Sequence, residues 1–184
     1  MARSLWHRSL WSMLALCGFA LAASLHLNGA PPAQAAAVSA PSSSSAVPEC
    51  RSADLRADYR ARDAATGHRF GVIRLRNVSD RTCVVQGYGG LSYVGGGDGT
   101  QVGAAADRDP GQARRVVLQP GERARSEISE TVAQNYPRAR CRPTPVDGFR
   151  VYVPDSTRSQ FVARPTTGCR NDAVHLLSHK PFHR

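Results

Sequence analysis

Residues 69–91 contain the pattern that most constrains how this chain can fold. Residues 70–76 alternate side chains between two faces, which is the period of a half-buried β-strand. A polar turn, Asn77–Asp80, follows, and residues 82–86 are predicted to return as the partner strand of a hairpin. The buried face of the first strand is expected to contain Gly71, Ile73 and Leu75.

Short segments of the same kind recur along the chain, separated by Gly, Pro, Asp and Asn. About eight strands at this spacing are typical of an antiparallel β-sandwich. A helical period is confined to a short stretch near the C-terminus, so the chain is predicted to be all-β. The other expected strands are residues 54–59, 91–94, 116–118, 123–128, 149–153 and 160–163.

Residues 1–35 have the three parts of a secretory signal peptide. Arg3 and Arg8 precede an apolar run, and small residues in an Ala-x-Ala arrangement end at Ala35. The apolar run, residues 10–25, is shorter than the roughly 20 residues of a membrane-spanning helix, which disfavours the alternative of an uncleaved anchor. We therefore predict export with cleavage near Ala35.

The composition changes again after the predicted cleavage site. Residues 36–48 are rich in Ser, Ala and Pro and contain few large apolar side chains, so they are predicted to be a flexible linker. Residues 49–177 are long enough for one domain with its own core. Residues 178–184 are predicted to be a basic, His-containing tail.

The predicted mature chain contains four cysteines: Cys50, Cys83, Cys141 and Cys169. An even number in an exported chain indicates two structural disulfides. Four cysteines allow three pairings. One of these, Cys50–Cys83 with Cys141–Cys169, would close two loops of about 30 residues each. The cysteine spacings do not match those of zinc sites.

The chain is strongly basic, with 24 Lys and Arg against 14 Asp and Glu, and Lys180 is its one lysine. An Arg-rich, Lys-poor composition is what a GC-rich genome encodes. The functional interpretation is an anionic partner, such as lipid headgroups, envelope polymers or acidic proteins. Nucleic acid is disfavoured, because the chain is predicted to be exported and its arginines form no basic stripe interleaved with aromatic residues.

No catalytic constellation is recognisable in the sequence. The serines lie in no Gly-x-Ser-x-Gly elbow, and the cysteines are expected to be oxidised. The glycine run 95–99 lacks the lysine of a phosphate-binding loop and is predicted to be a hairpin turn. The pair Glu127 and Glu130 is interpreted as solvated charges. We predict a protein that is not an enzyme; an unrecognised site would have to bring His68 together with a carboxylate and a hydroxyl.

Three histidines near the C-terminus recur at every fourth residue: His175, His179 and His183. On a helix they would share one face and could bind zinc, copper or nickel. Pro181 argues against a continuous helix through this segment. We assign no metal ligand, and retain a metal-handling protein as an alternative.

Two ordered blocks of residues carry a family resemblance. The first is Cys50, Leu75–Asn77, Cys83 and Gly87-Tyr88; the second is Val116–Ala124, Cys141, Val151–Pro154 and Gly168-Cys169. In order and spacing they resemble the exported bacterial family called domain of unknown function 4232. The resemblance implies an immunoglobulin-like antiparallel β-sandwich with two disulfides. It brings no assigned activity, cofactor or catalytic residue.

These observations together predict an exported, non-catalytic binding or interaction module of the cell envelope. Its partner is expected to be an anionic envelope component or another envelope protein. The sequence does not identify which residues would bind it.

Overall fold

The computed structural model describes residues 46–184. The predicted signal peptide and most of the predicted linker lie outside the described residues, and both remain predictions. In the described part of the chain no helix is long and apolar enough to cross a membrane.

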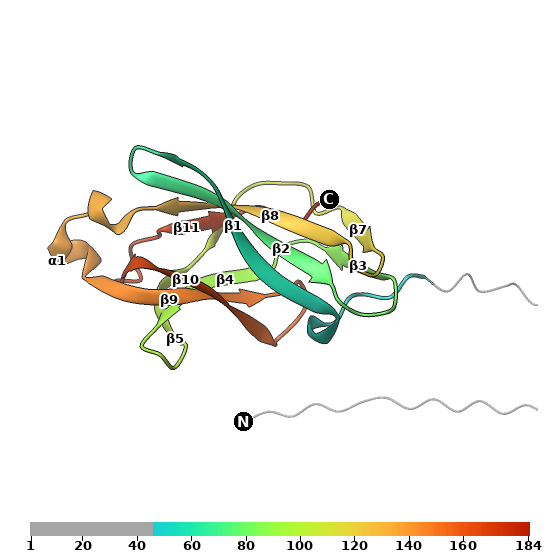
Figure 1. The fold of residues 1–184 in the computed structure, drawn as a ribbon. Helices are drawn as coiled ribbons and strands as arrows, with labels where there is room; N and C mark the ends of the chain where they lie inside the picture. Colours follow the sequence, from blue (N-terminus) through green and yellow to red (C-terminus); the bar gives the residue numbers. More distant parts are fainter. Residues whose placement is uncertain (1–45) are drawn as a thin grey trace, which may run out of the picture. The chain divides into compact units, whose positions relative to one another are not determined.

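The fold is an all-β sandwich, as predicted, with its five-stranded sheet drawn above its four-stranded sheet in Figure 1. The strand order is β1-β2-β8-β11-β6 in the first sheet and β10-β9-β4-β5 in the second, and β3 and β7 form a separate pair. All pairings are antiparallel except that of β11 with β6. The strands are β1 (Leu55–Ala65), β2 (His68–Asn77), β3 (Cys83–Gln86), β4 (Gly90–Gly95), β5 (Thr100–Ala105), β6 (Asp107–Arg108), β7 (Arg115–Leu118), β8 (Arg123–Thr131), β9 (Pro143–Tyr152), β10 (Ser159–Cys169) and β11 (Leu177–His179).

Three short helical segments complete the described residues: η1 (Ser52–Asp54), η2 (Ala133–Asn135) and α1 (Arg138–Cys141). The predicted turn at residues 95–99 is confirmed, because it joins β4 to β5. Three of its glycines have positive φ, the conformation that glycine adopts at little cost.

The core lies between the two large sheets and follows the predicted alternation. Ile73 and Leu75 are buried on the inner face of β2. Gly71 shares that face, and a Cβ there would lie 2.3 Å from Tyr59 Cε2. The glycine therefore leaves the space that the Tyr59 ring occupies.

The predicted hairpin between residues 70–76 and 82–86 is wrong. β2 pairs with β1 and β8, whereas β3 pairs with β7. The reason is Asn77, which is fully buried and whose Nδ2 donates to the carbonyl oxygens of Arg81 (2.8 Å) and Leu118 (3.0 Å). These bonds stabilise a turn that directs the chain away from β2.

Both predicted disulfides are present, and the pairing that the sequence left open is Cys50–Cys83 with Cys141–Cys169. The first bridge joins the start of the domain to β3. The second joins α1 to the end of β10. Both lie in the hydrophobic core.

The C-terminal segment is part of the sandwich and not the separate tail predicted for residues 178–184. No helix forms there; β11 pairs with β8 and β6. Phe182 is 2% exposed in the core, and His183 exchanges two backbone hydrogen bonds with Arg125 of β8. Burial of Phe182 and the free edge of β8 explain why residues 178–184 pack instead of fraying.

Acid is expected to destabilise the domain through His179. Burial holds the pKa of this histidine below its ordinary value, with a further lowering by Arg108 and opposing contributions from Lys180 and Asp109. The unfolded chain therefore binds the proton first, and stability falls as the pH drops below about 6.5. Melting temperatures measured between pH 7.5 and 5.5 should decrease in the native protein and change less in His179→Gln. An equal decrease in both proteins would contradict this assignment.

Candidate functional site

The outer face of the five-stranded sheet concentrates arginine side chains. Along β1, β2 and β8 seven of the residues that alternate with the core positions are arginines. We call this surface the arginine face. Its members are Arg56, Arg60, Arg62, Arg74, Arg76, Arg123 and Arg125.

Strand register aligns three of these arginines in one row. Arg56 pairs with Arg76, and Arg76 pairs with Arg123. Directly opposed side chains have Cβ atoms about 5 Å apart, and like charges in such pairs are destabilising. Within residues 46–184 no salt bridge joins any of the three to an acidic group. The fold thus maintains an uncompensated row of positive charge.

The next row contains one acidic residue. Asp58 accepts from Arg74 at 2.7 Å and lies 3.8 Å from the Arg60 guanidinium. Arg125 follows Arg74 in the same row. One carboxylate beside three guanidinium groups leaves this part of the arginine face positive as well.

A hollow of about 350 Å³ opens at the Arg62 end of the arginine face. Phe70, which is 39% exposed, supplies apolar surface there, beside Arg62 and Arg125. The acid in its lining, Glu127, accepts from His183 Nε2 at 2.7 Å. Burial acts to raise the pKa of Glu127, but the hydrogen bonds from His183 and from the backbone N–H of Glu127, with the charges of His183 and Lys180, together outweigh it, and the pKa lies below its ordinary value.

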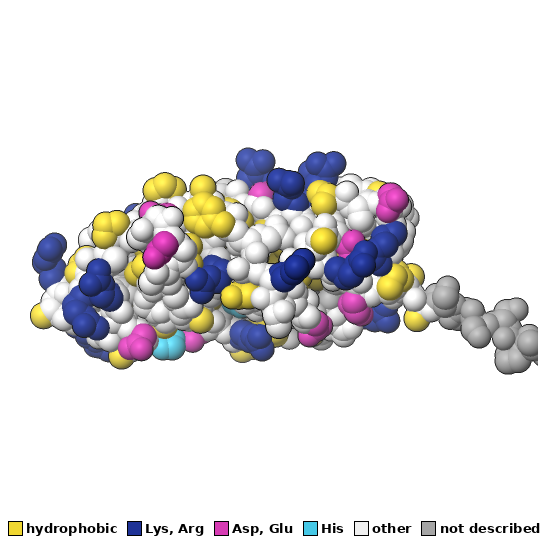
Figure 2. Space-filling model, turned by 90° about the horizontal axis from the view of Figure 1, so that it is seen from below, with side chains coloured by type: hydrophobic (Ala, Val, Ile, Leu, Met, Phe, Trp, Pro, Cys, Tyr) yellow, Lys and Arg dark blue, Asp and Glu magenta, His cyan; other side chains and the backbone are white. Residues whose placement is uncertain are grey.

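The opposite face of the sandwich has a different character. Figure 2 views the molecule from the side of the four-stranded sheet, where arginines are interspersed with apolar and acidic side chains. Phe161 of β10 is 60% exposed. A Cβ on Gly148 would lie 2.8 Å from Cε2 of its ring, so the glycine leaves room for the ring. The register of β9 with β10 and β4 brings no row of arginines together on this face.

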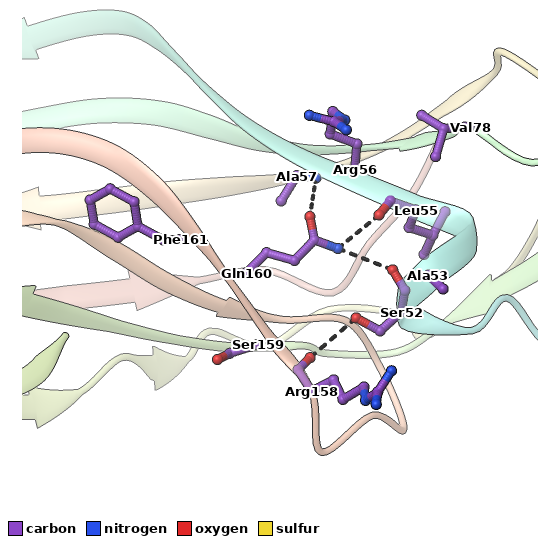
Figure 3. Close-up of a pocket in the computed structure, with 10 residues that line it drawn as sticks. All are labelled: Ser52, Ala53, Leu55, Arg56, Ala57, Val78, Arg158, Ser159, Gln160 and Phe161. Carbon is purple, nitrogen blue, oxygen red and sulfur yellow. Dashed lines mark hydrogen bonds between the residues drawn. The ribbon is translucent and has the colours of Figure 1, made fainter. Parts of the chain in front are cut away.

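A groove of about 430 Å³ lies between η1, β1 and β10 (Figure 3). Gln160 joins its two sides, because its Oε1 accepts from the backbone N–H of Ala57 (2.9 Å) and its Nε2 donates to the carbonyl of Leu55 (2.8 Å). A second link runs from Ser52 Oγ to the carbonyl of Arg158 (3.3 Å). One amide side chain therefore fastens the edge of one sheet to the edge of the other.

Glu130 is completely buried between the sheets, contrary to the prediction that it is a solvated charge. Its carboxylate accepts from Tyr93 Oη (2.7 Å), Tyr59 Oη (3.2 Å) and Arg164 (3.2 Å). Burial, reinforced by the charge of Glu130, raises the pKa of Tyr93. The cluster is enclosed and each of its members is hydrogen-bonded, so it acts as a polar core.

The histidines are not brought together by the fold. His179 is buried, His175 Nδ1 lies 2.8 Å from Asp107, and His183 contacts Glu127. Among residues 46–184 no three His, Cys, Asp or Glu side chains are placed to hold a metal ion. The helical face on which the metal hypothesis depended does not form, because the segment is extended.

His68 does not sit in the constellation that an unrecognised enzyme would need. Its Nδ1 lies 3.4 Å from Thr131 Oγ1, and its ring stacks on Phe70. Within the described residues no hydrogen bond or salt bridge links it to a carboxylate. The four cysteines are bridged, so none of them supplies a thiolate.

The fold and its disulfides define a class, the two-disulfide β-sandwich domain. Residues 50–183 match the family described as domain of unknown function (DUF4232), and the chain belongs to that family. The match includes most of the C-terminal segment beyond residue 177. No curated protein and no solved structure matches the chain significantly.

Proposed function

We propose that this domain is an exported, non-catalytic binding module that holds an anionic component of the cell envelope on its arginine face. The row of Arg56, Arg76 and Arg123 carries the proposal. Genome composition can account for many arginines, but it gives no reason for three to stand side by side without an acid. A bound polyanion would neutralise the row and relieve the repulsion.

The placement of the row on a sheet supports binding. β2 is hydrogen-bonded on both sides, to β1 and to β8, so the backbones that carry the guanidinium groups are fixed relative to one another. A guanidinium group presents several donors in a planar fork that suits carboxylate and phosphate oxygens. The backbone of such a surface loses little conformational freedom when a partner binds.

Export is part of the same proposal. Two disulfides are typical of proteins from oxidising compartments, and residues 1–35 have the layout of a signal peptide. An envelope location would give the arginine face access to phosphorylated or carboxylated polymers.

Removing two arginines from the row should weaken binding of a model polyanion. Long-chain polyphosphate is titrated into the full chain at 25 and 200 mM NaCl by calorimetry. We expect Arg76→Gln/Arg123→Gln to bind at least about tenfold more weakly than the native protein, since a hydrogen bond to a charged group contributes about 1.5–3 kcal/mol. Added salt should weaken native binding.

The matched control is Arg138→Gln/Arg140→Gln, which removes the same charge from α1. It should retain affinity within about threefold, because diffuse attraction between surface charges is weak. Equal losses in the two double variants would show that net charge alone attracts the polyanion. The absence of any binding to the native protein would refute the proposed function.

A further inference from the structure

The groove between β1 and β10 combines apolar lips with positive charge. Val78 and Phe161 are 48% and 60% exposed, the highest values among the large hydrophobic side chains of the described residues. Both line the groove, together with Arg56 and Arg158 (Figure 3). An exposed aromatic ring beside a hollow is a common anchor in protein recognition.

The floor of the groove needs no hydrogen bonds from an occupant. The amide of Gln160 is engaged with backbone groups of Ser52, Leu55 and Ala57. Among the described residues the one buried side-chain atom without a partner is Nε of Arg81, which does not line the groove. An apolar side chain can therefore lie on the floor of the groove without leaving a buried polar group without a hydrogen-bond partner.

Charge is placed at two sides of the groove. Figure 3 shows Arg56 on β1 and Arg158 before β10 on opposite sides of Gln160, each extending away from it. Both are exposed, and neither forms a salt bridge within residues 46–184. Two separated guanidinium groups fit two separated carboxylates better than one compact headgroup.

An ion pair anchors η1, which supplies Ser52 and Ala53 to the groove. Asp54 of η1 is 4% exposed and is paired with Arg81. Burial acts to raise the pKa of Asp54, but the hydrogen bonds from Arg81 and Arg51 and the charge of Arg81 together outweigh it, and the pKa lies below its ordinary value. The carbonyl of Asp54 also accepts from the N–H of Val78 (2.8 Å), which fixes one lip.

We propose that this groove binds an extended acidic peptide segment of a partner protein. An apolar side chain of the segment lies between Val78 and Phe161, and carboxylates on either side of it pair with Arg56 and Arg158. The inference rests on the proposed function, because Arg56 belongs both to the groove and to the arginine row. A lipid chain fits less well, since the groove is open and Ser52, Ser159 and Gln160 leave its lining polar.

The test uses two synthetic peptides of equal charge, Asp-Glu-Phe-Glu-Asp and Asp-Glu-Ser-Glu-Asp, titrated into the full chain by calorimetry. The phenylalanine peptide should bind about tenfold more tightly, the effect of burying part of one aromatic ring. Phe161→Ser should abolish this preference. Phe70→Ser, which removes the exposed phenylalanine of the arginine face, should leave it unchanged.

Charge and folding are tested separately. Arg158→Gln should weaken both peptides by a similar factor and keep their ratio. Melting curves verify that each variant folds, and Val78→Ser supplies a second lip variant that should also reduce the preference. A tenfold preference that survives both lip variants would overturn the inference.

Two further probes separate this inference from the proposed function. Polyphosphate binding together with equal affinities for the two peptides would overturn the inference and leave the proposed function standing. Failure of polyphosphate and of both peptides to bind would refute both. A lipid occupant is tested with decyl phosphate and butyl phosphate. If decyl phosphate binds more tightly, if this difference depends on Phe161, and if the two peptides bind equally, the occupant is a lipid and the peptide proposal is overturned.

Discussion

Replacement of Glu130 by alanine is expected to lower the free energy of unfolding by about 3–5 kcal/mol, the cost of breaking a buried ion pair. The substitution leaves Arg164, whose side chain is 20% exposed, without its carboxylate. It also deprives Tyr59 and Tyr93 of their hydroxyl acceptor. Chemical denaturation monitored by tyrosine fluorescence would measure the loss.

The matched control is Glu127→Ala on the same strand. Glu127 lies on the outer face, its side chain is 42% exposed, and its partner is a surface histidine. Pairs of this kind contribute about 0–1 kcal/mol. If Glu130→Ala costs no more than Glu127→Ala, the polar core does not stabilise the fold as its contacts indicate.

Removal of both disulfides is expected to have the largest effect on stability. The bridges join residues separated by 33 and 28 positions. In the chain-entropy model each contributes about 3.5 kcal/mol, and both together about 7 kcal/mol. Since domains are stable by roughly 5–15 kcal/mol, the reduced protein should be largely or entirely unfolded at 37 °C.

Single-bridge variants separate the two contributions. Cys50→Ser/Cys83→Ser and Cys141→Ser/Cys169→Ser should each lower the denaturation midpoint, and reduction with dithiothreitol should reproduce the sum. An unchanged midpoint after complete reduction would contradict the prediction.

Alternation of side chains with a period of two residues predicts most of the strands. In β8, Ala124, Ser126 and Ile128 alternate with outward-facing residues and share one buried face. The same alternation continued by one step places Glu130 on that face, where the structure has it. Its charge favours the interpretation as a solvated residue. The signal that corrects this interpretation is its position, because every second residue of a strand lies on the same face.

Strand pairing could not be deduced in the same way. Residues 77–83 look like a hairpin turn, but the buried amide of Asn77 directs β3 to a distant partner. For the same reason the arginine row was invisible in the sequence. Its members come from three strands, and their alignment depends on the pairing of β1, β2 and β8.

The histidine spacing illustrates a different limit. A four-residue interval keeps side chains on one face of a helix, but it also keeps them on one face of an extended strand, where every second residue points the same way. Pro181 was the one local signal against a helix. Burial of Phe182 and pairing of β11 with β8 decide the outcome, and both are tertiary effects.

The position of β11 has a consequence for when the domain can fold. This strand lies between β8 and β6 and is followed by Phe182, so residues 177–182 complete the five-stranded sheet and the core. A nascent chain that has not yet been extended past Phe182 cannot place these residues. The sandwich therefore closes only after the segment through Phe182 has been synthesised and has emerged from the ribosome.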